Sequence, residues 1–230
     1  MLALIIPERT YANELLENFE YSKENGPNGT EVYLCNYKNH RFLLVVTGYG
    51  KVNIGSSLRY VTEKYKVKVL LGFGSAGSIV DNVEILSAVI AKNALQFDVD
   101  FMPLGYMPAQ IPKVKKAIYQ ANEDLVECAK TACQKNCVNY CEGLVATSDM
   151  FVCNNRLSNS IRIEYDAAAV DCECGNIGQF AFMNKIPFVG IKVVSNYANN
   201  NAVRQYNLYD DEASIIAQKI VCNFLKEYYG

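Results

Sequence analysis

The chain has little of what several classes of protein depend on. Its 22 Lys and Arg residues are balanced by 24 Asp and Glu residues, and the formal net charge is −2. Nucleic-acid phosphates need a basic face, and no basic cluster occurs, so we expect no nucleic-acid partner. The apolar runs, such as Val67–Leu71, are far shorter than the ~20 residues that cross a bilayer, so we expect no membrane contact. The apolar N-terminus has no basic leader, which predicts a cytoplasmic protein without a signal peptide.

Motifs for metals and common cofactors are also missing. The one histidine, His40, lies in a polar turn, and the nine cysteines show no CxxC-type pairs of the kind that bind zinc. An odd number of cysteines fits no complete set of intramolecular disulfides, so we expect reduced, structural thiols. No P-loop occurs, nor a GxGxxG that runs directly into a helix, which gives a triphosphate or dinucleotide site weak support. We expect no metal and no cofactor.

What the sequence does contain is an alternation of apolar runs with helical periodicity. Half of the 230 residues are hydrophobic and a fifth are charged, as in globular domains. Strands are predicted from runs such as "LALIIP", "EVYLCNY", "RFLLVVTG" and "IPFVGIKVVSN". Helices are predicted from "KVNIGSSLRYVTEKY", "RLSNSIRIEY" and "DDEASIIAQKIVCNFLKEYY". The alternation predicts an α/β fold of three layers with a central mixed sheet, in one domain over residues 1–230.

Three local expectations concern less regular stretches. Helical spacing is predicted over 11–19, and again over about 114–135 after a Pro-rich loop. The segment 24–31, rich in Gly, Asn and Pro, is predicted to be a turn. "GFGSAGS", Gly72–Ser78, is predicted to be a glycine-rich turn at the end of a buried strand.

Five predicted strand ends share one character, because in each an apolar run stops at Gly, Ser, Asp, Glu or Asn. They are "VVTGYGK", "LLGFGSAGS", "LVATSDMFV", "AVDCECG" and "IKVVSNYA". One such end is ordinary turn chemistry. Several at the same edge of an open α/β sheet would build a ligand cleft.

Two of these strand ends allow a structural and a functional interpretation. Gly72–Ser78 is either a plain turn or a place where backbone N–H groups approach a ligand. Asp171 and Glu173 either complement the dipole of the helix that follows or accept hydrogen bonds from sugar hydroxyls. The local pattern does not decide between these interpretations.

Taken together, the motifs resemble those of a known enzyme family. "GSAGS", "GLVATSDMFV", "AVDCECGNIGQFAF", "IPFVGIKVVSN" and the loop "FDVDFMPLGYMPAQIP" occur in the order found in 5′-methylthioadenosine/S-adenosylhomocysteine nucleosidases, within the purine nucleoside phosphorylase superfamily. The resemblance covers about residues 42–211. It implies a nucleoside phosphorylase-like fold and cleavage of the N-glycosidic bond of a purine nucleoside, a small-molecule partner.

The resemblance also implies roles for individual residues. Phe151 would stack on the purine, Val152 would read its edge through the backbone, and Glu173 would hold the ribose hydroxyls. Lys192 stands where these nucleosidases have an Arg. Leu104 and Pro112 lie in the loop that closes the partner's site in the family, which implies a homodimer. The full expected substrate-binding set is Tyr49, Ser75, Ala76, Gly77, Phe151, Val152, Cys172, Glu173 and Ser195.

The position before the predicted Ser-Ala-Gly site favours hydrolysis over phosphorolysis. Phosphate binding needs a cation, typically Arg, and the phosphorylases of the superfamily carry one just before the "GS" of this motif. This chain has Gly72-Phe73 there. The resemblance therefore implies that water is the nucleophile.

The chain departs from the family at the two expected catalytic acids. Where the nucleosidases have an Asp that protonates the leaving purine, this chain has Asn196, whose amide cannot transfer a proton at ordinary pH. The second carboxylate, which activates water near the N-terminus, is either Glu8 at the strand end or Glu14 in the helix pattern, with a slight preference for Glu14. Catalytic candidates are thus Asn196, Glu8 and Glu14.

Several functions remain compatible with this sequence. The first is a purine nucleosidase, either of the ordinary adenine type with Asp149 or Asp171 compensating, or one turned by Asn196 towards 6-oxopurine nucleosides. The alternative is a protein that binds a purine or nucleoside without cleaving it. An engineered Asp-to-Asn replacement would give the same sequence.

Overall fold

The computed structural model describes all 230 residues, 1–230. Its strands are β1 (Leu2–Ile6), β2 (Tyr21–Asn25), β3 (Glu31–Tyr37), β4 (His40–Val46), β5 (Val69–Ser78), β6 (Ala88–Gln96), β7 (Tyr119–Gln120), β8 (Tyr140–Thr147), β9 (Ala167–Asp171) and β10 (Phe188–Asn196). Its α-helices are α1 (Asn13–Glu17), α2 (Lys51–Tyr65), α3 (Glu123–Lys135), α4 (Asn155–Tyr165), α5 (Cys174–Asn184) and α6 (Ala202–Tyr229). Short 3-10 turns cover Arg9–Ala12, Pro27–Gly29 and Met102–Leu104.

The sheet is mixed and partly closed on itself. Strands β5, β10, β6, β8 and β9 each pair with the next, and β9 pairs back to β5, so these strands form a ring. From β5 the sheet continues through β1 and β4 to the antiparallel strands β3 and β2. The central mixed sheet and α/β class expected from the sequence are confirmed.

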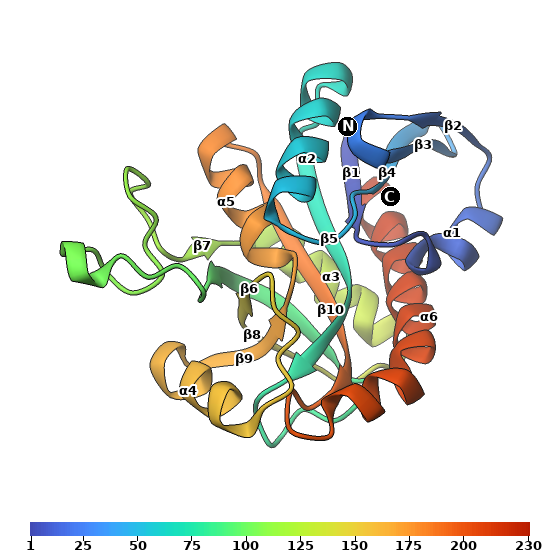
Figure 1. Ribbon diagram of the computed structural model, residues 1–230. Helices are drawn as coiled ribbons and strands as arrows, with labels where there is room; N and C mark the ends of the chain where they lie inside the picture. The colour runs from blue at the N-terminus through green and yellow to red at the C-terminus, as the bar shows by residue number, and fades with distance from the viewer.

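Helices cover both faces of this sheet (Figure 1). α2 and α5 lie on one side, and α3 and α6 lie together on the other, where α6 packs along β10 and β5. The long α6 buries a stripe that includes Ala213, Ala217, Ile220 and Phe224. This stripe, the strands and α3 share the main hydrophobic core, so the floor beneath the strand ends is rigidly packed.

Most of the predicted elements are present, and the differences have identifiable causes. The helix predicted over 114–135 begins at Glu123, because Asn122 caps it by accepting a hydrogen bond from the Leu125 N–H. The predicted turn Gly72–Ser78 belongs to β5 and stays extended along β10, with β1 pairing on its other side at Gly72 and β9 at Gly77 and Ser78. Glycine there serves close packing, since a Cβ at Gly72 would lie 2.6 Å from the Ile177 side chain of α5.

The N-terminal part also differs from the prediction. The helix expected over 11–19 is a 3-10 turn followed by the short α1, and part of the turn expected over 24–31 belongs to the edge strand β2. That strand is exposed along most of its length, so it lacks the apolar alternation on which a prediction depends. No helix combines the length and the apolar character that crossing a membrane would require.

Candidate active site

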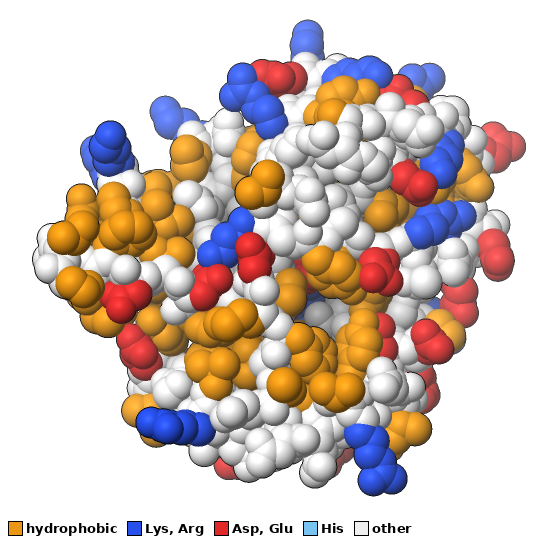
Figure 2. Space-filling model, in the orientation of Figure 1, with side chains coloured by type: hydrophobic (Ala, Val, Ile, Leu, Met, Phe, Trp, Pro, Cys, Tyr) orange, Lys and Arg blue, Asp and Glu red, His pale blue; other side chains and the backbone are white.

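A single cavity of about 590 Å³ opens where the strand ends meet. Figure 2 shows the molecule hollowed near the centre of the face in view, with hydrophobic and acidic side chains around the opening. Five strand ends that the sequence singled out contribute to the lining. The lining residues are Pro7, Glu8, Tyr11, Tyr49, Gly50, Ser75, Ala76, Gly77, Asp149, Met150, Phe151, Val152, Val170, Asp171, Cys172, Glu173, Asn196, Val203 and Tyr206.

The strand directions explain why these ends converge. β1, β4, β5 and β10 run parallel to one another, whereas β8 and β9 run the opposite way. β5 and β9 pair only near their carboxyl ends, Gly77 with Val170 and Ser78 with Ala169. The carboxyl ends of both groups therefore meet at this junction, and the loops that follow them enclose one cavity.

Asn196 is held at the end of β10 with its amide orientation fixed. Its Oδ1 accepts a hydrogen bond from the Ala198 N–H at 2.9 Å, and its Nδ2 donates to Ser195 Oγ at 3.1 Å. A bulge between Val194 and Asn196 shifts the strand register so that Asn196 pairs with Gly77. One N–H of the Asn196 amide is left for the cavity that this side chain lines.

Gly77 is the counterpart of this arrangement. A Cβ on Gly77 would lie 2.8 Å from Asn196 Oδ1 and 3.0 Å from the Ala198 Cβ. The motif "SAG" thus needs its glycine to let the Asn196 side chain pack against the neighbouring strand. This is a packing reason, and it places both residues in the same wall of the cavity.

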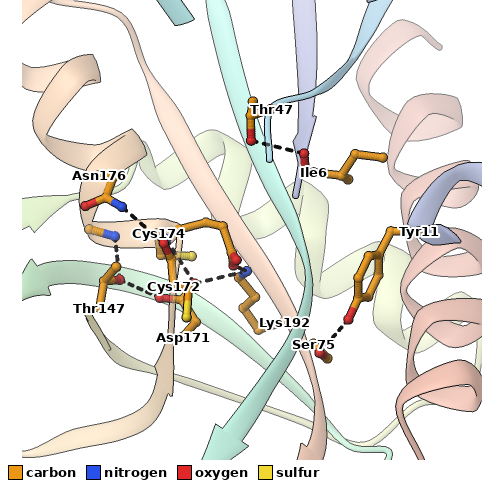
Figure 3. Close-up of polar contacts among 12 residues, drawn as sticks. Ile6, Tyr11, Thr47, Ser75, Thr147, Asp171, Cys172, Cys174, Asn176 and Lys192 are labelled. Atoms are coloured by element: carbon orange, nitrogen blue, oxygen red, sulfur yellow. Dashed lines mark hydrogen bonds and ion pairs between the residues drawn. The ribbon is translucent and has the colours of Figure 1, made fainter. Parts of the chain in front are cut away.

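A buried ionic group lies on the opposite side, formed by Asp171, Glu173 and Lys192; we call it the charged trio (Figure 3 labels Asp171 and Lys192). Lys192 Nζ lies 3.0 Å from Asp171 Oδ2 and also contacts Glu173 Oε2. Asp171 further accepts from the Thr147 hydroxyl and, at 2.9 Å, from the Cys174 N–H. All three charged side chains are nearly or fully inaccessible to solvent in the free protein.

The trio sets the protonation of its members. Burial, together with the negative charge of Asp171, raises the pKa of Glu173 to about 7 despite the attraction of Lys192. Burial alone would raise the pKa of Asp171, but Lys192, Thr147 and the Cys174 N–H hold it below its ordinary value. Burial would lower the pKa of Lys192, yet the two carboxyl groups raise it well above its usual range. Lys192 and Asp171 therefore stay charged near neutral pH, and Glu173 titrates there.

A second polar group connects the cavity to α6. The Tyr11 hydroxyl lies 2.8 Å from Ser75 Oγ and 2.9 Å from each carboxylate oxygen of Asp210. Figure 3 shows the Tyr11 side chain reaching from the N-terminal segment towards Ser75 on β5. Tyr11 is 2% exposed, and burial together with the Asp210 charge raises its pKa, so it remains a neutral phenol.

Aromatic side chains form the more open part of the cavity. Phe151 is 46% exposed and lies edge-on to Tyr206, with 5.4 Å between the ring centroids. Tyr49 is also partly exposed, and burial of its hydroxyl raises its pKa. The Cys172 thiol remains neutral, because burial and the adjacent acids raise its pKa to about 12. These rings offer flat apolar surfaces of the kind that stack on a planar ligand.

The structure brings most of the predicted site residues together, and it separates four. Ser195 lies behind Asn196 and is fully buried. Leu104 and Pro112 lie in the 97–118 segment, which contributes no residue to the cavity lining, and Leu104 is exposed. Glu14 lines a different cavity, beside Leu15 and Gln218. The cavity contains the other predicted residues: Glu8, Tyr49, Ser75, Ala76, Gly77, Phe151, Val152, Cys172, Glu173 and Asn196.

Of the two candidate carboxylates, the cavity contains Glu8, whereas the slightly preferred Glu14 lies elsewhere. The segment after β1 first forms a 3-10 turn over Arg9–Ala12, and this turn directs Tyr11 rather than Glu14 to the cavity. Glu8 directly follows the strand end and lines the cavity. Nothing in the sequence pointed to Tyr11 and Asp210, which lie 199 residues apart, or to the buried ion pairs of Lys192.

No group of three or more His, Cys, Asp or Glu side chains is arranged to hold a metal ion. The acids of the cavity have other partners, since Asp171 and Glu173 pair with Lys192 and Asp149 accepts from the Lys51 N–H at 3.0 Å. What the arrangement offers a ligand is a set of hydrogen-bonding groups, one titrating carboxyl group and aromatic faces.

Comparisons with known proteins agree with this description. The family model described as "Phosphorylase superfamily" matches residues 4–228. A 5′-methylthioadenosine/S-adenosylhomocysteine nucleosidase of Staphylococcus carnosus is 31% identical over 189 residues, which cover 82% of each chain. The crystal structure of the Neisseria meningitidis nucleosidase of that name, in complex with methylthio-immucillin-A, superposes with a TM-score of 0.93 at 24% identity over 98% of each chain.

A third similar structure concerns an amide in place of an acid. It is an aspartate-to-asparagine mutant of the Helicobacter pylori nucleosidase with 5′-methylthioadenosine in the active site. Its TM-score is 0.92 at 21% identity, and the match covers 98% of each chain. At this identity the likeness concerns the fold.

Proposed function

This chain belongs to the phosphorylase superfamily, and within it to the family of 5′-methylthioadenosine/S-adenosylhomocysteine nucleosidases, and we propose that it hydrolyses the N-glycosidic bond of purine nucleosides of the methylthioadenosine type. The observation that carries the proposal is the convergence of Ser75–Gly77, Phe151, Glu173 and Asn196 on one cavity. These residues come from four separate strand ends, so their meeting is a property of the fold.

The charges of the cavity favour water over phosphate as the nucleophile. Its lining includes four acids, Glu8, Asp149, Asp171 and Glu173, and no Lys, Arg or His. The nearest buried cation, Lys192, is already paired with two of these acids. A phosphate dianion would meet repulsion here without a cationic partner, whereas water would meet acceptors.

We assign the ribose side to the charged trio. Glu173 in its ionised form is an acceptor for sugar hydroxyls, and Lys192 fixes its position from behind. Negative charge near the ribosyl group also stabilises the oxocarbenium-like transition state of glycosidic cleavage. Glu8 is the N-terminal carboxylate that faces the cavity, and it would hold the attacking water.

We assign the purine side to Phe151, Val152 and Asn196. The fixed amide of Asn196 turns its oxygen to the Ala198 N–H and leaves an N–H for the ligand. That N–H would donate to the purine N7, which lowers the energy of the departing purine anion without transferring a proton. Because this help is weaker than protonation, we expect slower turnover than an acid at this position would give.

The proposal extends to assembly and location. The segment 97–118, which projects from the body at the left of Figure 1, exposes Phe101, Met102, Leu104 and Met107. An apolar patch of this kind is typical of an interface, and we propose a homodimer in which Leu104 and Pro112 approach the partner's site. The nine cysteines are free thiols, which fits a reducing, cytoplasmic compartment, and residues 1–230 would form one domain.

One assay tests the proposed reaction. The protein is mixed with methylthioadenosine, S-adenosylhomocysteine, adenosine or inosine, with and without phosphate, and free purine is measured. We expect purine release from methylthioadenosine without phosphate. Release that requires phosphate would overturn the hydrolase assignment, and release from inosine alone would redefine the substrate as a 6-oxopurine nucleoside.

A second candidate function is nucleoside binding without cleavage, and the observation that favours it is Asn196 itself. The Helicobacter pylori mutant, with methylthioadenosine in its active site, indicates that this fold holds a nucleoside when an aspartate is replaced by asparagine. Calorimetric binding of methylthioadenosine with no purine release after prolonged incubation would establish this function instead.

A further inference from the structure

We infer that Ser75, Tyr11 and Asp210 form a relay of hydrogen bonds that carries the proton of the attacking water from the cavity to α6. The inference rests on the proposed hydrolysis and adds a positioning pair, Tyr11 and Asp210, to it. Its starting point is a buried tyrosine that lines the cavity and contacts a carboxylate outside the lining.

The direction of each hydrogen bond follows from the number of protons. A tyrosine hydroxyl has one proton, and the two oxygens of Asp210, each 2.9 Å from the Tyr11 hydroxyl, can only accept it. Ser75 Oγ, 2.8 Å from the same hydroxyl, must then be the donor of the other bond. The Ser75 proton points at Tyr11, so its oxygen presents only lone pairs to the cavity.

A serine held in this way is an acceptor, which is what a nucleophilic water needs. As the water oxygen bonds to the ribosyl carbon, the bond to the purine nitrogen breaks and its electron pair leaves with the purine. The water proton passes to Ser75 Oγ, the Ser75 proton to Tyr11 and the Tyr11 proton to Asp210. Each hydroxyl accepts one proton as it gives one up, so neither becomes an anion, and the half-buried Asp210 later loses its proton to solvent.

The alternative acceptor in the cavity is Glu8, and the structure distinguishes the two. The Glu8 carboxylate is exposed and makes no hydrogen bond or ion pair with another side chain. Asp210 is oriented by the Tyr11 hydroxyl, and Tyr11 is itself buried and held by Ser75 as well. Preorganised groups contribute more to a reaction than mobile ones, so we assign proton removal to the relay and water binding to Glu8.

The experiment compares kcat and KM for methylthioadenosine in the wild type and in Tyr11→Phe, Asp210→Asn and Asp210→Glu. Cutting the relay should lower kcat at least tenfold in the first two variants and leave KM within about twofold. Asp210→Glu, which keeps the acceptor, should recover part of the loss. The double variant Tyr11→Phe/Asp210→Asn should be no slower than the slower single one, because both belong to one chain of bonds.

The matched control is Tyr119→Phe. Tyr119 is as buried as Tyr11, but its hydroxyl has no hydrogen-bond partner and lies outside the cavity lining, so the change should leave both constants unaltered. A Tyr11→Phe protein with the wild-type kcat, or one that loses only KM, would overturn the relay while the hydrolase assignment stands. Glu8→Gln without activity beside active Tyr11→Phe would do the same. A folded wild type that releases no purine would overturn the proposed function, and the relay with it.

Discussion

The two sides of the cavity differ in their content of ionisable groups. The charged trio concentrates three ionisable groups where water is excluded, and each is compensated by the others. The side formed by Phe151, Val152 and Asn196, which we call the neutral wall, contains no ionisable group at all. Under the proposed assignment, the charged side holds and polarises the sugar, and departure of the base depends on a hydrogen bond.

Removing the cation should have the largest effect on the charged trio. In Lys192→Met two buried carboxyl groups, Asp171 and Glu173, lose their shared partner, and breaking a buried ion pair from one side typically costs about 3–5 kcal/mol. We expect a loss of this order in the free energy of unfolding, measured by urea denaturation. Lys192→Arg keeps the charge and serves as the control with a smaller loss. Full stability of the Met variant would mean that the trio does not need its cation.

An acid in the neutral wall should remove the difference between the two sides of the cavity. Asn196→Asp places a proton donor beside the leaving base, and general acid catalysis is typically worth about 10²–10⁴-fold in rate. We expect kcat for methylthioadenosine to rise by at least about 10²-fold. Asn196→Ala, which removes the donor N–H, should change kcat in the other direction. An Asp variant no faster than the wild type would show that other parts of the site have also lost their function.

The charged trio should also reveal itself in the dependence of stability on pH. The pKa of Glu173 is raised to about 7, so between the unfolded value and pH 7 the folded protein binds a proton that the unfolded chain has lost. Stability from this group is complete below the unfolded pKa and is lost as the pH rises through about 7. This contribution to the free energy of unfolding is of the order of 3 kcal/mol, because each pKa unit corresponds to about 1.36 kcal/mol.

Glu173→Gln provides the measurement for this effect. The variant cannot titrate at this position. The unfolding free energy of the wild type should therefore fall relative to that of the variant as the pH rises from 5 to 8. Asp171 and Lys192 do not interfere, because their shifted pKa values lie below and above this window. A constant difference would contradict the raised pKa of Glu173.

The smallest effect is expected at the neutral wall's aromatic ring. Phe151 is half exposed and its ring lies edge-on to Tyr206, so Phe151→Leu should remove little stability. Losing the face on which the purine stacks typically costs about 0.5–1.5 kcal/mol, which we expect as a two- to tenfold rise in KM. Thermal unfolding supplies the control, and a KM equal to that of the wild type would place the purine elsewhere.

The sequence predicted the parts of this site that are local and missed those that depend on the path of the chain. Apolar runs stopping at small or polar residues located the cavity, because such strands end at its rim. The choice between Glu8 and Glu14 depended on a 3-10 turn that no periodicity announces. Tyr11 and Asp210 belong to elements whose contact arises only when α6 packs back over β5. Gly77 has the pattern of a turn residue, and only the folded chain places the Asn196 side chain against it.

The ring of strands is closed by a very short seam. β5 and β9 pair through only two residues on each side, and that pairing lies directly at the cavity, with Gly77 and Val170 in the lining. A nucleoside that contacts Ser75–Gly77 on one strand and Glu173 after the other would span this seam. Such a ligand would therefore act as a removable cross-link across the seam, and the ring of strands would be more stable whenever the site is occupied.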